Sequence, residues 1–246
     1  MKREIHRYEE IDSTNMEAKR LAEAGAPHGT LVIAELQTAG RGRRGRRWNS
    51  PKGTGVWFSL LLKPKIAPGD ASGLTLAAAM AVVRAIERVA GLPVQIKWPN
   101  DIVLSGKKVC GILTEMSEQS AHVDHIVVGI GINVKPRTFP PEIAETATYL
   151  GVEVSGMELI EAVLEEFEIY YEKYMQTLDA SLFLREYENY LVNKDKQVKV
   201  LDPKGAYEGV ARGINARGEL LVEREGRVLT VNSGEVSVRG IYGYVP

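Results

Sequence analysis

The sequence predicts an α/β (α+β) protein, with helices packed on one face of a mixed β-sheet and a small β-barrel after it. The first observation is that apolar, β-branched runs and segments of helical period share the chain up to about residue 190. The second is that only short β runs follow residue 193, separated by turns rich in glycine, proline and asparagine. Five short strands in succession indicate a small barrel. We therefore expect two domains, residues 1–193 and 194–246.

Each element has a local signal. Thr14-x-x-Glu17 and Ser155-x-x-Glu158 have the spacing of capping boxes, so helices are expected at 15–23 and 155–174. A core helix at 73–89, apolar all round, and a helix at 180–190 complete the set. Strands are expected where apolar and β-branched residues gather, at 5–8, 30–35, 55–62, 95–98, 101–104, 107–115, 125–132, 197–201, 207–214, 220–223, 228–230 and 235–239.

The composition excludes several classes of protein. The chain has 246 residues, of which 44% are hydrophobic and 26% charged, with a net charge of −1, so it is not a general polyanion-binding protein. Its single cysteine, Cys110, allows no internal disulfide, and no His/Cys cluster has zinc spacing. There is no apolar signal region and no run of 18 apolar residues, so we expect a cytoplasmic protein that does not bind membranes.

An arginine–glycine loop, residues 37–48, is the strongest local signal. It carries five arginines within seven residues, interleaved with glycines: Arg41, Arg43, Arg44, Arg46 and Arg47. Glycine lets the backbone approach a ligand closely, and the arginine fork fits carboxylate or phosphate oxygens. Taken alone, the segment is equally typical of an RNA-binding tract, a nuclear-import-like patch or a solvated charge run.

The segment Lys97-Trp98-Pro99-Asn100-Asp101 is the second signal. Its lysine and carboxylate are four residues apart and are braced by Trp-Pro. Asp101 could hold Mg²⁺, which prefers one or two carboxylates together with substrate phosphates, and Lys97 could neutralise phosphate charge. The alternative is a surface turn with a buried tryptophan.

Lys108 lies in a predicted strand next to small residues. Strict alternation would place Lys108 and Cys110 on one face and Lys107 and Val109 on the other, with Lys108 pointing inward. The alternative is a solvated edge charge. Cys110 has no histidine near it in the sequence and is interpreted as a small core residue.

Two weaker signals lie on either side of these. Gly129-Ile130-Gly131-Ile132-Asn133 predicts a strand with a flat glycine face, against which a planar group could lie, and Asn133 could bind an adenine edge. Ser13-Thr14-Asn15 stands at a predicted helix start, where polar ligand atoms can bind, although ordinary capping also explains it.

Together and in this order, the five motifs resemble the biotin–protein ligases over about residues 5–135. The resemblance implies a class II synthetase-like catalytic domain and an SH3-like C-terminal barrel. It also implies a two-step reaction: biotin and MgATP give biotinyl-5′-AMP and pyrophosphate, and a lysine of a biotin carboxyl carrier domain then takes the biotin. A homodimer is implied too, with the glycine-rich sheet as a candidate dimer surface. Because the matching region begins near Tyr8, we expect no winged helix-turn-helix domain and no specific DNA binding.

The resemblance also implies roles for individual residues. Arg43 and Lys108 should be catalytic, and Asp101 should contact the metal of MgATP. Biotin should be bound by Ser13, Thr14, Asn15, Gln37, Gly40, Arg41, Gly42, Arg43, Lys108 and Gly111. ATP and the adenylate should be bound by Arg41, Arg43, Arg44, Arg46, Trp48, Lys97, Asn100, Asp101, Lys108 and Asn133. A lipoate- or octanoate-type ligase and an RNA-binding module are the alternatives.

Overall fold

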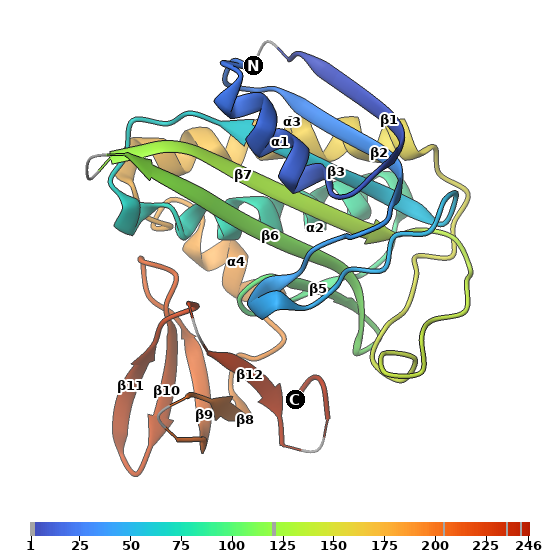
Figure 1. The fold of residues 1–246 in the computed structure, drawn as a ribbon. Helices are drawn as coiled ribbons and strands as arrows, with labels where there is room; N and C mark the ends of the chain where they lie inside the picture. The colour runs from blue at the N-terminus through green and yellow to red at the C-terminus, as the bar shows by residue number, and fades with distance from the viewer. Residues whose placement is uncertain (1–2, 120–121, 204, 235, 242) are drawn as a thin grey trace.

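A seven-stranded mixed sheet forms the centre of the larger part of the molecule (Figure 1). The computed structural model describes residues 3–119, 122–203, 205–234, 236–241 and 243–246. The strand order is β1-β2-β3-β7-β6-β5-β4, with β1 and β2 parallel and the other pairs antiparallel. The bounds are β1 Ile5–Ile11, β2 Leu31–Gln37, β3 Gly55–Leu62, β4 Gln95–Lys97, β5 Asp101–Leu104, β6 Lys107–Gln119 and β7 His122–Asn133.

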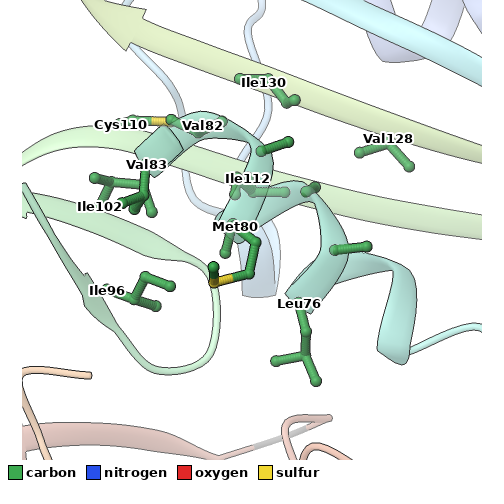
Figure 2. Close-up of a cluster of buried hydrophobic side chains, with 14 of the residues drawn as sticks. Leu76, Met80, Val82, Val83, Ile96, Ile102, Cys110, Ile112, Val128 and Ile130 are labelled. Atoms are coloured by element: carbon green, nitrogen blue, oxygen red, sulfur yellow. The ribbon is translucent and has the colours of Figure 1, made fainter. Parts of the chain in front are cut away.

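Two long helices cover one face of this sheet, α2 (Gly73–Ala90) and α3 (Gly156–Thr177). Twelve of the 18 residues of α2 are buried, which confirms the predicted core helix. Its Leu76, Met80 and Val83 lie in the same apolar cluster as Ile112 of β6 and Val128 of β7 (Figure 2). The expected helix at 180–190 is shorter, α4 (Leu184–Tyr190).

Helix α1 (Thr14–Glu23) packs on the opposite face of the seven-stranded sheet. Its Ala18 and Ala22 form a separate cluster with Val32, Leu61 and Val127. These strand residues alternate with those that face α2 and α3, so they point the other way. The expectation that helices pack on one face therefore holds for α2 and α3 but not for α1.

The predicted capping boxes do not form. Ser13 and Ser155 are the N-cap residues of α1 and α3, and neither makes a side-chain capping hydrogen bond. Glu17 instead accepts a hydrogen bond from the Tyr8 hydroxyl at 2.7 Å. The spacing located both helices correctly, but the Thr14 side chain has another partner, described below.

A five-stranded antiparallel sheet forms the C-terminal part, in the order β11-β10-β9-β8-β12. Its strands are β8 Lys196–Leu201, β9 Tyr207–Ile214, β10 Leu220–Arg224, β11 Arg227–Val231 and β12 Ser237–Gly240. The strand predicted at 235–239 begins at Glu235, which lies outside the described residues. The described residues contain no helix long and apolar enough to cross a membrane.

Trp98 joins the two parts. Its indole N–H donates to the Gly218 carbonyl at 2.9 Å, and its backbone N–H donates to Asn193 Oδ1 at 2.9 Å. Apolar residues of β8, β9 and β10 belong to the same core cluster as α2 and α3. The C-terminal sheet is therefore fixed against the large sheet. Its strand β12 lies on the side of the large sheet that holds β5 (Figure 1).

Candidate active site

A cavity of about 810 Å³ lies where the two parts meet. The arginine–glycine loop, the ends of β5, β6 and β7, and the segment around β12 line it. All of the residues predicted for the site line this cavity, except Gly40. Motifs spread from Ser13 to Asn133 in the sequence are thus gathered around a single space.

Gly40 lies just behind the cavity and shapes the loop. Its carbonyl accepts a hydrogen bond from the Trp48 backbone N–H at 2.9 Å. A Cβ at this position would lie 2.4 Å from the Trp48 carbonyl oxygen. Glycine is required here because the two ends of the loop approach so closely.

One end of the cavity is lined by neutral hydrogen-bonding groups. Gln37 Oε1 accepts hydrogen bonds from the backbone N–H and hydroxyl of Thr14, at 2.8 and 3.1 Å. Ser59 Oγ lies 2.8 Å from Thr14 Oγ1 and 2.6 Å from Asn15 Oδ1. Ser13 is buried beside them. This connected network holds its hydroxyl and amide groups in fixed orientations, which suits recognition of a small polar ring.

Glu115 of β6 holds side chains at the same end of the cavity in place. Its carboxylate accepts a hydrogen bond from Asn15 Nδ2 at 2.8 Å and pairs with Lys19 at 2.8 Å and Arg41 at 3.5 Å. Burial opposes its ionisation, but the bonds to Lys19 and Asn15 outweigh burial and keep the pKa of Glu115 below its ordinary value. Arg41 is therefore tied to the strand beneath the polar end.

Arg43 crosses from the loop to the C-terminal part. Its guanidinium donates to Asn100 Oδ1 at 2.9 Å, to the Val236 carbonyl at 3.2 Å and to the Ser233 carbonyl. Burial lowers its pKa, although nearby Asp101 acts in the opposite direction. Arginine stays charged even so, and Arg43 brings a fixed cation to the other end of the cavity.

That other end holds a cluster of cations around one carboxylate. Asp101 Oδ1 lies 2.5 Å from Lys108 Nζ, and Asp101 Oδ2 accepts a hydrogen bond from the Tyr244 hydroxyl. Burial opposes ionisation of Asp101, but Lys108 and Lys97 outweigh it and keep its pKa low. Burial lowers the pKa of Lys97 to about 8, although Asp101 raises it. With Arg43, the cluster has more positive than negative charge, as an anion site requires.

A β-bulge aims Lys108 into the cavity. Between β5 and β6 the register shifts, so that Cys110 is opposite Ile102 but Lys108 is opposite Val103. The extra residue places Lys108 on the face of Gly111, whereas Cys110 points into the core (Figure 2). The expected inward lysine is confirmed, but its expected sharing of a face with Cys110 is wrong. The core position of Cys110 is confirmed, and burial raises its pKa.

The glycine face of β6 and β7 is covered by Trp48. A Cβ on Gly131 would lie 2.4 Å from Trp48 Nε1, and one on Gly111 would lie 2.9 Å from the same ring. Asn15 covers Gly129 in the same way, where a Cβ would lie 1.9 Å from Asn15 Oδ1. The planar group expected against this face is therefore the chain's own indole. Gly129 and Gly131 are buried in the cavity wall and Gly111 is half-buried, and the suggested use of the glycine-rich sheet as a dimer surface stays a prediction.

Asn133 is buried at the edge of the cavity with its amide already engaged. Its Nδ2 donates to the Thr148 carbonyl and its Oδ1 accepts from Arg137, both at 2.9 Å. Arg137 also donates to Asn49 Oδ1 at 2.6 Å, and its guanidinium carbon lies 4.5 Å from the Phe139 ring centroid. In this arrangement Asn133 positions Arg137 and the segment that follows β7.

Four residues of the site were missed by reasoning from the sequence: Ser59, Glu115, Arg137 and Tyr244. Ser59 could have been found, because it is the single polar residue in the apolar run of 56–62. Arg137 and Tyr244 lie in segments without periodicity or a motif, so only the fold reveals them.

The residues at the cationic end can supply part of a Mg²⁺ site. Asp101 is the carboxylate, and no group of three or more His, Cys, Asp or Glu occurs among the described residues. Mg²⁺ commonly takes one or two protein carboxylates and fills its other positions with phosphate oxygens and water. The donor set therefore fits a metal that arrives with a nucleotide, and not one held by the protein alone.

The cavity has neutral hydrogen-bonding groups at one end and cations at the other, as in a class of protein suited to a small polar ligand and an anion. The model of the Biotin/lipoate A/B protein ligase family matches residues 8–133, and that of the Biotin protein ligase C terminal domain matches residues 195–239. The chain belongs to the biotin/lipoate A/B protein ligase family.

Known relatives resemble the chain over most of its length. The bifunctional ligase/repressor BirA of Bacillus subtilis is 40% identical over 93% of this chain and 72% of its own. The biotin–[acetyl-CoA-carboxylase] ligase of Mycobacterium tuberculosis is 33% identical over 91% of this chain and 85% of its own. The biotin protein ligase of Aquifex aeolicus, solved in complex with biotin and ATP, superposes with a TM-score of 0.83 at 33% identity, covering 96% of this chain and 98% of that one.

Proposed function

We propose that this protein is a biotin–protein ligase that activates biotin with MgATP and transfers it to a lysine of a carrier domain. The observation that carries the proposal is the division of the cavity into two chemically different ends. Neutral amides and hydroxyls around Thr14 and Gln37 suit the ureido ring of biotin. The cations around Asp101 suit its carboxylate and the phosphates of ATP.

In the first step, an oxygen of the biotin carboxylate attacks the α-phosphorus of ATP. The bond between the α-phosphorus and the bridging oxygen breaks, and pyrophosphate leaves with the electron pair. Both reactants are anions and repel each other. Lys108 and Arg43 offset this repulsion and stabilise the charge that develops at the phosphorus. Mg²⁺ would neutralise part of the triphosphate charge when bound, with Asp101 as its protein ligand.

The remaining predicted residues are assigned by their place in the cavity. We assign Ser13, Asn15, Gly42 and Gly111, which all line the cavity, to biotin. We assign Arg44, Arg46, Lys97 and Asn100, which also line the cavity, to the nucleotide. We place the adenine beside Trp48 and Asn133, with Asn133 acting through Arg137 because its own amide is engaged.

In the second step, the neutral amine of a carrier lysine attacks the carbonyl carbon of biotinyl-5′-AMP. An amide forms, AMP leaves, and the attacking nitrogen loses a proton. The carrier should be the biotin carboxyl carrier protein or domain of a biotin-dependent carboxylase, as the name of the Mycobacterium tuberculosis relative suggests. The enzyme needs no nucleophile of its own, in agreement with the buried, inert position of Cys110.

The proposal is tested with biotin, MgATP and a purified carrier domain. Mass spectrometry should show the carrier gaining one biotin, and omission of either biotin or ATP should abolish the gain. Lipoate in place of biotin distinguishes the other branch of the family. A carrier that gains lipoate but not biotin would refute the proposed substrate.

We also propose that the protein is a cytoplasmic homodimer without specific DNA binding, and that residues 1–193 and 194–246 are its domains. The family resemblance supports the dimer, and the net charge of −1 supports the absence of DNA binding. The separate C-terminal sheet supports the division. Sedimentation velocity tests the dimer, and a gel-shift assay on the upstream DNA of biotin-related genes tests the absence of DNA binding.

A further inference from the structure

One tyrosine near the C-terminus covers both groups that are expected to meet the nucleotide phosphates. The Tyr244 hydroxyl donates to Asp101 Oδ2, and Lys97 Nζ lies 4.4 Å from the centroid of the Tyr244 ring. The far oxygen of Asp101 is held by Lys108. Both oxygens of the Asp101 carboxylate and the ammonium of the buried Lys97 are therefore in contact with groups of the protein itself.

The surroundings of Tyr244 are those of a binding site and not those of a core. Tyr244 lines the cavity, and the apolar core clusters of the described residues do not include it. The charges that act on it come from Asp101, Arg239 and Arg46. A phenol placed among such groups gains one hydrogen bond and one cation–π contact, whereas a phosphate would gain several charge-assisted bonds.

The segment that carries Tyr244 is a short arm. It follows β12 and packs by Val245 near Gly106, in the turn between β5 and β6, where a Cβ would lie 3.2 Å from the valine side chain. Val245 also lies against Gly240 of β12, where a Cβ would lie 2.2 Å from the Val245 carbonyl oxygen, so the arm folds back on the strand that it follows.

We propose that Tyr244 occupies the place of the ATP phosphates and is displaced when the nucleotide binds. This inference rests on the proposed function. Tyr244 then acts as an internal competitor of ATP, whereas biotin, which binds at the Thr14 end, does not compete with it. Removing the side chain should tighten nucleotide binding and leave biotin binding unchanged.

Isothermal titration with Mg²⁺ and α,β-methylene-ATP, which resists cleavage at the α-phosphorus, tests the competition. Tyr244→Phe keeps the ring over Lys97 but loses the bond to Asp101, so its Kd should fall about fivefold, the equivalent of one net hydrogen bond. Tyr244→Ala should lower Kd further. Tyr207→Phe, on the same C-terminal sheet and outside the cavity lining, is the matched control and should match the wild type. Biotin Kd and thermal melting check that each variant is folded.

A second measurement follows the side chain directly. In protein labelled with 3-fluorotyrosine, the ¹⁹F resonance missing from Tyr244→Phe identifies Tyr244. It should shift on addition of the nucleotide analogue and stay in place on addition of biotin. Equal or weaker nucleotide binding by Tyr244→Ala, or a resonance that the analogue does not move, would overturn the inference. If neither the wild type nor any variant binds the analogue, the proposed function itself fails, and the inference with it.

Discussion

The proposed role of Lys108 depends on its exchanging one partner, Asp101, for a bound anion. In the structure its ammonium is paired with Asp101 at 2.5 Å and lies 5.2 Å from the centroid of the Trp48 ring. An anion entering the cavity between Arg43 and Lys108 would compete with Asp101 for it. The lysine is thus held ready, close to the point where we place the reacting phosphorus, before any substrate arrives.

Replacing Lys108 by alanine should slow formation of biotinyl-5′-AMP by about 100-fold or more, as loss of a fixed charge at a reacting centre does in other enzymes. Single-turnover measurement of adenylate formation checks this. Arg43→Ala should be slowed as well, and Lys63→Ala, far from the cavity lining, should keep the wild-type rate. Wild-type rates in both Lys108→Ala and Arg43→Ala would remove the assignment of these residues.

The buried Lys97 predicts a pH dependence. Burial lowers its pKa to about 8, so the free enzyme loses this positive charge as the pH rises from 7 to 9. Phosphate oxygens favour the charged form, and nucleotide Kd should therefore rise over this range, by at most about tenfold per pH unit. Calorimetric titration with α,β-methylene-ATP measures it. The Lys97→Met variant should bind the nucleotide analogue weakly at all pH values. If its Kd depended on pH as steeply as that of the wild type, the titrating group would be another residue.

At the scale of elements, glycines in β6 and β7 allow other parts of the chain to pack directly on the sheet. Gly129 and Gly131 leave room for Asn15 and Trp48 to lie directly on the sheet. The bulge at the start of β6 turns Lys108 toward the same space. Binding groups of the α1 helix, the loop and two strands therefore converge at one place because of backbone geometry.

Gly129→Ala should weaken biotin binding and lower the melting temperature. The new methyl group would meet Asn15 Oδ1, which also bonds to Ser59, so this network must shift at a cost of about 1–3 kcal/mol. Gly69→Ala is the matched control, because a Cβ there meets nothing within 4 Å and the backbone is not in the left-handed region. Calorimetry and thermal melting make the comparison, and equal effects of the two changes would contradict this account.

The sequence alone predicted most of the helices and strands, and it predicted many of the residues that line the cavity. Periodicity located α2 and nearly all strands, and the order of the motifs predicted that Thr14, Arg43 and Lys108 belong to one site. Prediction from the sequence failed where a tertiary contact decides which way a side chain points or which partner it bonds. The bulge at Val109 breaks the alternation on which the facing of Lys108 was judged. The partners of Thr14 and Glu17 lie on other strands, so their spacing alone could not show that no capping box forms.

At the scale of the whole molecule, the cavity is shared between the two sheets. Trp98 follows β4 of the large sheet, and its indole is bonded to Gly218 of the C-terminal part. Arg43 of the loop reaches carbonyls at Ser233 and Val236 on the same side. Movement of the C-terminal part would therefore alter the nucleotide end of the cavity.

Trp98→Phe should reduce the free energy of unfolding by about 1–3 kcal/mol beyond the effect of the smaller ring, because the carbonyl of the buried Gly218 loses its hydrogen-bond donor. Urea denaturation measures this. Trp57→Phe is the matched control, since Trp57 Nε1 is equally buried and has no hydrogen-bond partner among the described residues. A larger loss of stability in Trp57→Phe than in Trp98→Phe would contradict the bridging role.

The central claim is that one cavity binds biotin at its neutral end and the phosphates of ATP at its cationic end, so that the two react. Exchange of labelled pyrophosphate into ATP tests this most directly, because it reports reversible adenylate formation without a carrier domain. We expect rapid exchange that requires both biotin and Mg²⁺ and is lost in Lys108→Ala. Exchange that proceeds equally without biotin, or none at all with biotin bound, would contradict the account.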